Sequence, residues 1–209
     1  AIHAAAELVH GERHALSVVV DARSGELEAV AFGDPIGSWA AAADVAAESH
    51  VVYLDRPAQR VLSLVAPRYD DLWTGAKGFY KVEPVVADGG EVVLHAPHIT
   101  RIAAMHPALD ELGYHCRDYF LAHWDEYRDH PRGELAHSTH LYGAGTWDPV
   151  EGERPRVHVV LATGIPEAVT HRANLGYRDP ATVDPADWAS DPDALVVPDA
   201  GEVLYRLRP

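Results

Sequence analysis

Residues 60–95 decide the fold, and they read RVLSLVAPRYDDLWTGAKGFYKVEPVVADGGEVVLH. The stretch begins with a short, apolar, β-branched run at 60–66 that is typical of a buried strand, and a proline ends it. Two aspartates at 70–71 stand where a helix cap belongs, and residues 72 to about 86 have a helical pattern. A second buried strand follows at 91–95. Because short links join these elements, they predict a βαβ unit with parallel strands and a right-handed crossover.

The same reasoning extends outward along the chain. Residues 156–162 (RVHVVLA) predict a third buried strand, so we expect an α/β fold with an open, Rossmann-like, mostly parallel sheet flanked by helices. An N-terminal β-hairpin is expected at 14–20 and 27–32. Residues 129–153 lack periodicity and predict a long loop region. Further helices are expected at 2–9, from 35 to about 49, within 107–124 with a break near Gly113, and from 163 to about 173; further strands are expected at 51–54, at 195–197 and, as a strand or a helix, at 203–207.

Composition limits the classes of function. The chain has 209 residues, 47% of them apolar, and a net charge of −15, which suits one large domain. This acidity provides no basic footprint for nucleic acid and disfavours an anionic membrane surface. No apolar run approaches the roughly 20 residues that span a bilayer, and no signal-peptide pattern is present. The chain opens in helix-like sequence without a methionine, so we expect it to be one domain of a larger enzyme.

Cys116 is the only cysteine, which excludes an internal disulfide framework. It is interpreted as a buried small residue, because no acid partner or glycine-rich elbow accompanies it. A single thiol fits a reducing compartment, and we therefore expect a cytoplasmic location. The common nucleophile and nucleotide motifs, G-x-S-x-G, the P-loop and G-x-G-x-x-G, do not occur.

Lysine is nearly absent: 15 of the 17 basic residues are arginines, and the two lysines are Lys77 and Lys81. Their spacing of four places them on one side of a helix. Ligands of open α/β sheets lie beyond the carboxyl ends of the strands, and this helix follows such an end. With Trp73 and Thr74 beside it, Lys77 in the first two helical turns predicts a site for a small carboxylate. The alternative is a solvated helix face with surface lysines.

Two glycines interrupt this helix. Gly75 and Gly78 each lower helix propensity by about 1 kcal/mol relative to alanine. We therefore expect something packed closely against them, either another element or a ligand.

Fourteen histidines include two H-x-x-H pairs, His95 with His98 and His137 with His140. Zinc pairs on helices need one-face spacing and usually a third ligand, and neither pair is expected in a clear helix. The two pairs therefore give only weak support for a metal site, and no metal ligand is assigned. The pairs are interpreted either as hydrogen-bonding or proton-shuttling groups that line a cleft near a polar substrate, or as ordinary histidines.

Seven motifs follow one another along the chain: SVVVD (17–21), LEAVAFGD (27–34), RVLSLVAPRYDDLWTGAKG (60–78), VADGGEVVLHAPH (86–98), LAHSTH (135–140), LATGIPE (161–167) and NLGYRDPAT (174–182). In this order they resemble the C-terminal part of the lactate racemase family, the nickel-pincer-dependent 2-hydroxyacid racemases and epimerases. The resemblance covers most of the chain. It rests on the order of the motifs, because none of them is diagnostic alone.

The resemblance implies a two-domain enzyme with its active site between the domains. The N-terminal domain would carry the nickel-pincer nucleotide, its attachment lysine, the metal histidine and the acid and base histidines, and this chain has no counterpart of that domain. Residues 1–209 would form the C-terminal, substrate-side domain, with the N-terminal domain and a small 2-hydroxy acid as partners. The implied reaction removes a proton from the C2 hydroxyl and transfers a hydride from C2. We therefore expect these 209 residues alone to be inactive.

The resemblance also assigns residues. Lys77 matches the family lysine that helps to hold the substrate carboxylate. Thr74 stands where the lactate enzyme has a glutamine, and Trp73 where it has a tyrosine. These two differences argue against lactate as the substrate. The runs at 135–140, 161–167 and 174–182 resemble a branch of the family that is expected to act on larger 2-hydroxy acids, such as sugar acids. The alternatives are a binding or regulatory module with the same fold, and a metal hydrolase that uses the H-x-x-H pairs.

Overall fold

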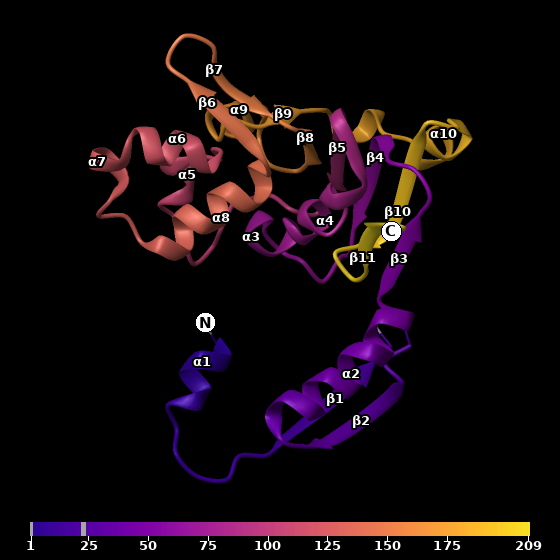
Figure 1. Ribbon diagram of the computed structural model, residues 1–209. Helices are drawn as coiled ribbons and strands as arrows, with labels where there is room; N and C mark the ends of the chain where they lie inside the picture. Colours follow the sequence, from indigo (N-terminus) through magenta and orange to yellow (C-terminus); the bar gives the residue numbers. More distant parts are fainter. Residues whose placement is uncertain (1, 22–23) are drawn as a thin grey trace. The chain divides into compact units, whose positions relative to one another are not determined.

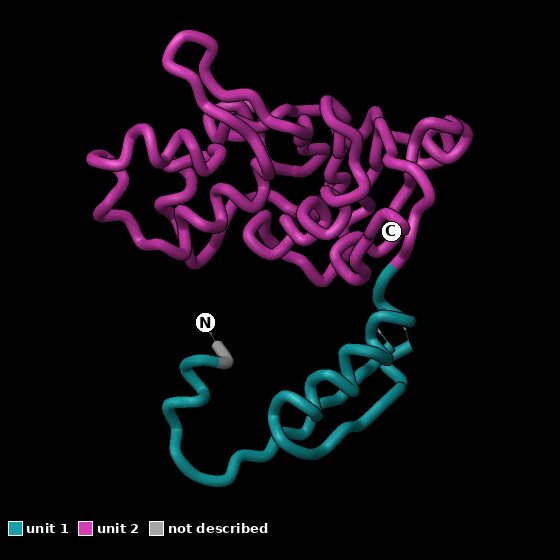
Figure 2. Tube along the Cα trace, in the orientation of Figure 1, with its two compact units in different colours: residues 1–51 teal, residues 52–209 magenta. Residues whose placement is uncertain are grey.

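The computed structural model describes residues 2–21 and 24–209, and the chain divides into two compact units, 1–51 and 52–209 (Figure 2). The second unit contains a five-stranded sheet in which every neighbouring pair of strands is parallel (Figure 1). The predicted fold class is therefore confirmed. In spatial order the strands are β10 (Ala194–Ala200), β4 (Ala58–Val65), β5 (Val86–Ala96), β8 (His158–Thr163) and β9 (Gly176–Tyr177).

The first unit contains the predicted hairpin and helix. Strands β1 (Ala15–Val20) and β2 (Leu27–Gly33) pair in antiparallel fashion, and α2 (Pro35–Ser49) packs on them. The side chain of Asp34 caps α2 by accepting hydrogen bonds from two of its first backbone amides, and a proline occupies the first helical turn. A short helix, α1 (Ile2–Glu7), precedes the hairpin.

Alternating residues of the parallel strands are buried on opposite faces of the sheet. Val61 of β4 belongs to the larger hydrophobic cluster, while its neighbour Leu62 belongs to a smaller cluster with Val93 and Trp188. Both faces are thus covered, which explains why these strands are almost continuously apolar in sequence. The smaller cluster includes α10 (Pro185–Ser190), which contributes Trp188.

Near the carboxyl ends of the strands, the predicted helix at 72–86 is shorter and broken. It consists of α3 (Leu72–Gly75), α4 (Lys77–Tyr80) and a 3₁₀ turn, η1 (Glu83–Val85). Pro84 ends it early because proline cannot donate the next helical hydrogen bond. The following strand, β5, accordingly begins at Val86, five residues before the predicted start.

The prediction of a long loop at 129–153 is wrong. Residues Arg132–Tyr142 form the helix α8, and a hairpin follows from β6 (Gly145–Asp148) and β7 (Gly152–Pro155). The inward face of α8 has helical spacing, but half of it is polar: Glu134, His137 and Ser138 are buried with the hydrophobic residues. A search for apolar periodicity misses such a helix, because polar side chains occupy its core positions.

The remaining elements connect this framework. The helical region predicted at 107–124 breaks at Gly113, as expected, where φ is 68°. None of the described helices has the length and apolarity that crossing a bilayer requires. The other elements are α5 (Leu109–Leu112), α6 (Arg117–Ala122), α7 (Trp124–Tyr127), α9 (Glu167–Arg172), η2 (Pro180–Thr182) and a two-stranded sheet of β3 (Val51–Leu54) with β11 (Leu204–Leu207).

Candidate carboxylate-binding site

The segment α3–α4 is held tightly at the carboxyl ends of the central strands. Asp71, itself buried, caps α3 by accepting a hydrogen bond from Thr74 N at 3.0 Å, as the sequence predicts for this position. A Cβ atom on Gly75 would lie 2.7 Å from Ile99 Cδ1. One on Gly78 would lie 3.0 and 3.1 Å from side chains that end β4 and β5. The two glycines therefore permit the helix to approach the sheet closely, so the expected packing partner is another element.

Lys77 projects from this segment with its positive charge unneutralised. Among the residues that the structure describes, no carboxylate forms an ion pair with its ammonium group. The ammonium nitrogen lies 5.0 Å from the ring centroid of Tyr69, in the loop after β4. An aromatic face attracts a cation without neutralising it, so the charge remains available to an anion.

Tyr69 is held in place by the turn after β10. Its hydroxyl donates a hydrogen bond to Glu202 Oε1 at 2.8 Å. Burial, together with Glu202, raises the pKa of Tyr69 to about 12, so the ring stays neutral at physiological pH. Gly201 adopts a φ of 104°, and a Cβ there would meet the Tyr69 ring at 2.7 Å. This turn therefore requires glycine and positions the ring against Lys77.

Lys81, the other lysine, has a different environment. Its ammonium donates a hydrogen bond to the backbone carbonyl of Glu202 at 3.1 Å, and burial lowers its pKa. Lys81 thus fastens α4 to the turn after β10. Although the spacing places both lysines on one helix, only Lys77 lacks such a protein partner among the described residues.

Trp73 and Thr74 lie one turn before Lys77. The hydroxyl of Thr74 donates to Asp71 Oδ1 at 2.8 Å, so it can offer a ligand only its lone pairs. Two imidazoles contact the Trp73 ring: that of His106 is stacked on it with the ring centroids 3.9 Å apart, and that of His137 is tilted against it at 4.0 Å. Trp73 therefore belongs to a wall of side chains to which α8 and the loop after β5 contribute.

The two H-x-x-H pairs occupy different places. His137 and His140 are on α8, where His137 packs on Trp73 and His140 lies 5.6 Å, centroid to centroid, from Tyr80 of α4. The prediction that this pair is outside a helix is therefore wrong. His95 is on β5 and, by strand alternation, shares the sheet face of Val93, opposite the face that α4 covers. His98 is exposed, and its Nε2 lies 3.1 Å from the Tyr69 carbonyl oxygen.

The described residues do not provide a nickel site. No group of three or more histidine, cysteine, aspartate or glutamate side chains within 2–21 and 24–209 is arranged to hold a metal ion. The ammonium group of Lys77 has no lone pair to offer a metal, and the imidazoles of His98, His106 and His137 come from two separate segments, the loop after β5 and α8. These residues therefore do not fit a nickel-pincer nucleotide, and none of them is assigned to it.

Sequence reasoning missed three residues of this wall: His106, Tyr114 and Glu134. Glu134 Oε1 lies 3.3 Å from His106 Nδ1, and the ring centroid of Tyr114 lies 5.8 Å from that of His137. These residues come from the loop after β5, the segment after α5 and the helix α8. A correct assignment of α8 would place Glu134 on the same helix face as His137, three residues later, but no sequence spacing brings His106 or Tyr114 to them.

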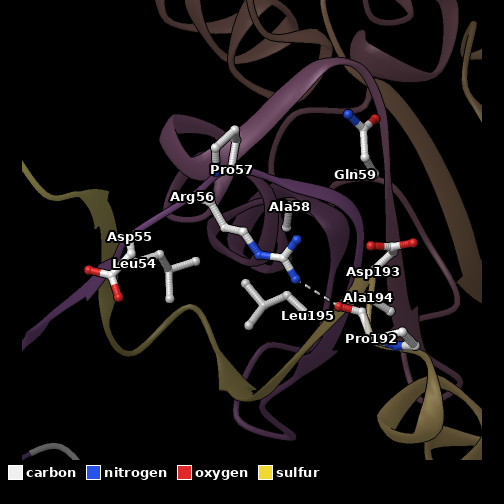
Figure 3. Close-up of a pocket in the computed structure, with 10 residues that line it drawn as sticks. All are labelled: Leu54, Asp55, Arg56, Pro57, Ala58, Gln59, Pro192, Asp193, Ala194 and Leu195. Carbon is white, nitrogen blue, oxygen red and sulfur yellow. Dashed lines mark hydrogen bonds between the residues drawn. The ribbon is translucent and has the colours of Figure 1, made fainter.

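Two cavities occur at the opposite, amino-end edge of the sheet. A cavity of about 470 Å³ is lined by residues 54–59 and 192–195, where β4 and β10 begin (Figure 3). Its arginine, Arg56, donates a hydrogen bond to the carbonyl of Pro192 at 3.2 Å. A second cavity, of about 390 Å³, adjoins the start of β8 and contains His158 and Asn174. Because open α/β sheets bind ligands at the carboxyl ends of their strands, we place the candidate site at Lys77.

Comparison with known proteins gives structural matches only. No protein-family model matches the chain, and no curated protein sequence matches it. A Thermotoga maritima protein solved by a structural genomics consortium is 33% identical, with a TM-score of 0.84 over 93% of this chain and 49% of that one. The lactate racemase apoprotein from Thermoanaerobacterium thermosaccharolyticum is 16% identical, with a TM-score of 0.66 over 92% of this chain and 46% of that one.

The chain thus spans about half the length of each of these two solved structures. An identity of 16% supports a shared fold and does not carry over substrate or cofactor. Together with the parallel sheet and the lysine-bearing helix at its carboxyl edge, the match shows that this chain has a lactate racemase-like fold.

Proposed function

We propose that residues 1–209 form the substrate-binding domain of a racemase or epimerase that acts on 2-hydroxy acids. The observation that carries this proposal is the position of Lys77, whose ammonium group has no ion-pair partner among the described residues and lies at the carboxyl edge of a parallel sheet. The lactate racemase-like fold supports the same reading.

Lys77 binds the substrate carboxylate in this proposal. A fixed cation orients the carboxylate and holds the neighbouring C2 carbon in one position, which lowers the entropic cost of reaching the transition state. Trp73 packs against the carbon chain of the substrate. Asp71 and Thr74 act indirectly, since their mutual hydrogen bonds hold the first turn of the helix.

The chemistry of the C2 hydroxyl and of the hydride is outside this domain. The resemblance implies a nickel-pincer nucleotide that is held by an N-terminal cofactor domain. We propose this N-terminal domain as the partner of the chain, and we also propose a cytoplasmic location. The single cysteine is buried, and a lone thiol is compatible with a reducing compartment. We expect no racemisation by the 209 residues alone. Detectable turnover of a 2-hydroxy acid by this chain would contradict the assignment of the chemical step to an N-terminal domain.

The test compares the two lysines. Titration calorimetry of the 209-residue chain measures binding of L-lactate and of its uncharged analogue lactamide. We expect lactate to bind and lactamide not to bind. Lys77→Met removes the charge but keeps the length of the side chain, and we expect it to weaken lactate binding by about tenfold or more, because hydrogen bonds to charged groups contribute about 1.5–3 kcal/mol.

Lys81→Met is the matched control. Because Lys81 binds a backbone carbonyl, its replacement should lower the melting temperature and leave lactate binding within about threefold of the unmodified chain. Equal weakening by the two variants, or equal binding of lactate and lactamide, would remove the basis for the proposal.

A further inference from the structure

The β1–β2 hairpin of the first unit has one face that α2 covers and one face that it does not (Figure 1). Successive side chains of a strand point to opposite faces of its sheet. Ser17 and Val19 share the covered face, where Ser38 of α2 is hydrogen-bonded to Ser17 Oγ at 2.8 Å and Val19 is buried. The other face, called the open face below, consists of three cross-strand pairs: Leu16 with Phe32, Val18 with Val30, and Val20 with Leu27.

All six side chains of the open face are apolar and exposed, from 44% for Val20 to 71% for Phe32. The two strands contain one charged residue, Glu28, whose carboxylate accepts a hydrogen bond from Ser49 Oγ of α2 at 2.7 Å. The open face therefore carries no charge. Because monomeric soluble proteins seldom expose a contiguous patch of several large apolar side chains, such a face is expected to bind a partner.

The strand sequences also indicate burial on both faces. Residues 15–20 read ALSVVV and residues 27–32 read LEAVAF, so both runs are almost continuously apolar. A strand with one solvated face alternates apolar and polar residues, whereas continuous apolar runs are typical of strands that are covered on both sides. Among the described residues no third strand joins this hairpin, and a two-stranded sheet is marginally stable without further packing.

The comparison with the Thermotoga maritima protein indicates what covers the open face. The match includes 93% of the 209 residues, so about 15 residues lie outside it, whereas the first unit has 51. Most of the first unit is therefore matched in that protein. The match accounts for only 49% of the other chain, so about as much polypeptide again accompanies the hairpin there. A segment of that size can supply the missing layer.

Other occupants are less suitable. The chain has a net charge of −15, so a second copy would bring two strongly acidic molecules together, and an anionic lipid surface would repel the chain. A domain of the same polypeptide is held close to the hairpin at a high effective concentration, which favours packing on an uncharged apolar face.

We propose that the open face of the β1–β2 hairpin is the surface on which the N-terminal domain of the full-length protein packs. The inference rests on the proposed function for the existence of that domain, and it names the surface that the domain binds. The partner surface is apolar and uncharged, because a charged group set against these six side chains would lose its hydration without gaining a partner.

The experiment uses introduced thiols. Cys116 is the only cysteine and is 0% exposed, so a maleimide reports on a cysteine placed elsewhere. Phe32→Cys and Val30→Cys place a thiol on the open face, and both positions are exposed, so neither variant removes a buried side chain. His158→Cys, at an exposed position where β8 begins, is the matched control.

In the 209-residue chain we expect all three thiols to react at rates within about threefold of one another, because all three are exposed. In the full-length protein Phe32→Cys and Val30→Cys should react at least about tenfold more slowly, and His158→Cys should keep its rate. Labelling of the two open-face thiols at unchanged rates in the full-length protein would overturn the inference.

Protection of Phe32→Cys in the 209-residue chain would also overturn it. Protection that does not depend on concentration would mean that another part of this chain covers the face, and protection that is lost on dilution would mean that a second copy does. Lactate titrations of the same variants separate this inference from the proposed function. Unprotected thiols with lactate binding intact would overturn the docking surface alone, whereas protected thiols in a protein that binds no lactate would overturn the proposed function alone.

Discussion

The two edges of the parallel sheet differ in what they offer a ligand. At the amino-end edge there is a cavity of about 470 Å³, and its arginine, Arg56, donates a hydrogen bond to a backbone carbonyl (Figure 3). At the carboxyl-end edge Lys77 has no ion-pair partner among the described residues, and three buried polar atoms, Tyr114 Oη, Glu134 Oε2 and His137 Nε2, lack a hydrogen bond. A charge without an ion-pair partner and buried polar atoms without hydrogen bonds, more than the presence of a cavity, therefore indicate which edge of the sheet is expected to bind a ligand.

The largest effect is expected where the helix meets the carboxyl edge. Gly78→Leu would force a buried side chain against Val65 and Leu94, whose atoms already lie within about 3 Å of where its Cβ would be. We expect a loss of about 3 kcal/mol in the free energy of unfolding, measured by urea denaturation, together with loss of lactate binding.

Gly133→Ala on α8 is the control for this prediction, because its Cβ would meet nothing within 4 Å. It should change the free energy of unfolding by less than about 1 kcal/mol. Tolerance of leucine at Gly78 would show that close packing does not position Lys77.

A smaller effect is expected from acid. The pKa of His137 is lowered to about 4 in the folded chain from an ordinary value of 6.5, so below pH 6.5 the unfolded chain binds a proton that the folded chain does not. The contribution of His137 to stability is complete above pH 6.5 and declines as the pH falls toward 4. Between pH 7.5 and 4.5 we expect it to account for a loss of about 2 kcal/mol in the free energy of unfolding.

Urea denaturation at the two pH values checks this expectation. His137→Phe should reduce the loss on acidification by that amount, whereas His158→Phe, at an exposed histidine of the amino-end edge, should leave it unchanged. An identical pH dependence in the unmodified chain and in His137→Phe would contradict the assignment of a neutral, buried imidazole at the carboxyl edge.

The smallest effect is expected at the amino-end cavity. Arg56→Ala removes one hydrogen bond to Pro192 from an exposed side chain, so the free energy of unfolding should change by about 0.5 kcal/mol at most. Lactate binding should not change in the calorimetric titrations. A large loss of lactate affinity would reverse the comparison between the two edges.

Much of the framework could be predicted because local signals agreed with one another. The apolar runs at 60–66, 91–95 and 156–162 each correspond to a strand of the parallel sheet, and Asp71 caps the helix that follows the first of them. The glycines of that helix indicated close packing, and the structure shows the sheet as the packing partner. These features depend on hydrogen-bonding capacity and periodicity over short distances, which a sequence displays directly.

The polar wall of the site could not be predicted in the same way. Glu134 and His137 are buried on α8, where polar side chains obscured the helix, and Tyr114 and His106 join them from segments distant in sequence. The spacing H-x-x-H also has no fixed meaning. On α8 it places both imidazoles toward α3 and α4, but at the end of β5 it puts His95 on the opposite face of the sheet.

The sequence by itself determined the α/β class, the three central buried strands and the lysine that follows the first of them, since burial of apolar strands and helix capping are local requirements. Only the tertiary structure decided that Lys77 is unpaired while Lys81 is bound, and that Tyr114, Glu134 and His137 meet beside Trp73. Whether a polar group has a partner depends on which distant segments fold against it, and no spacing along the chain contains that information.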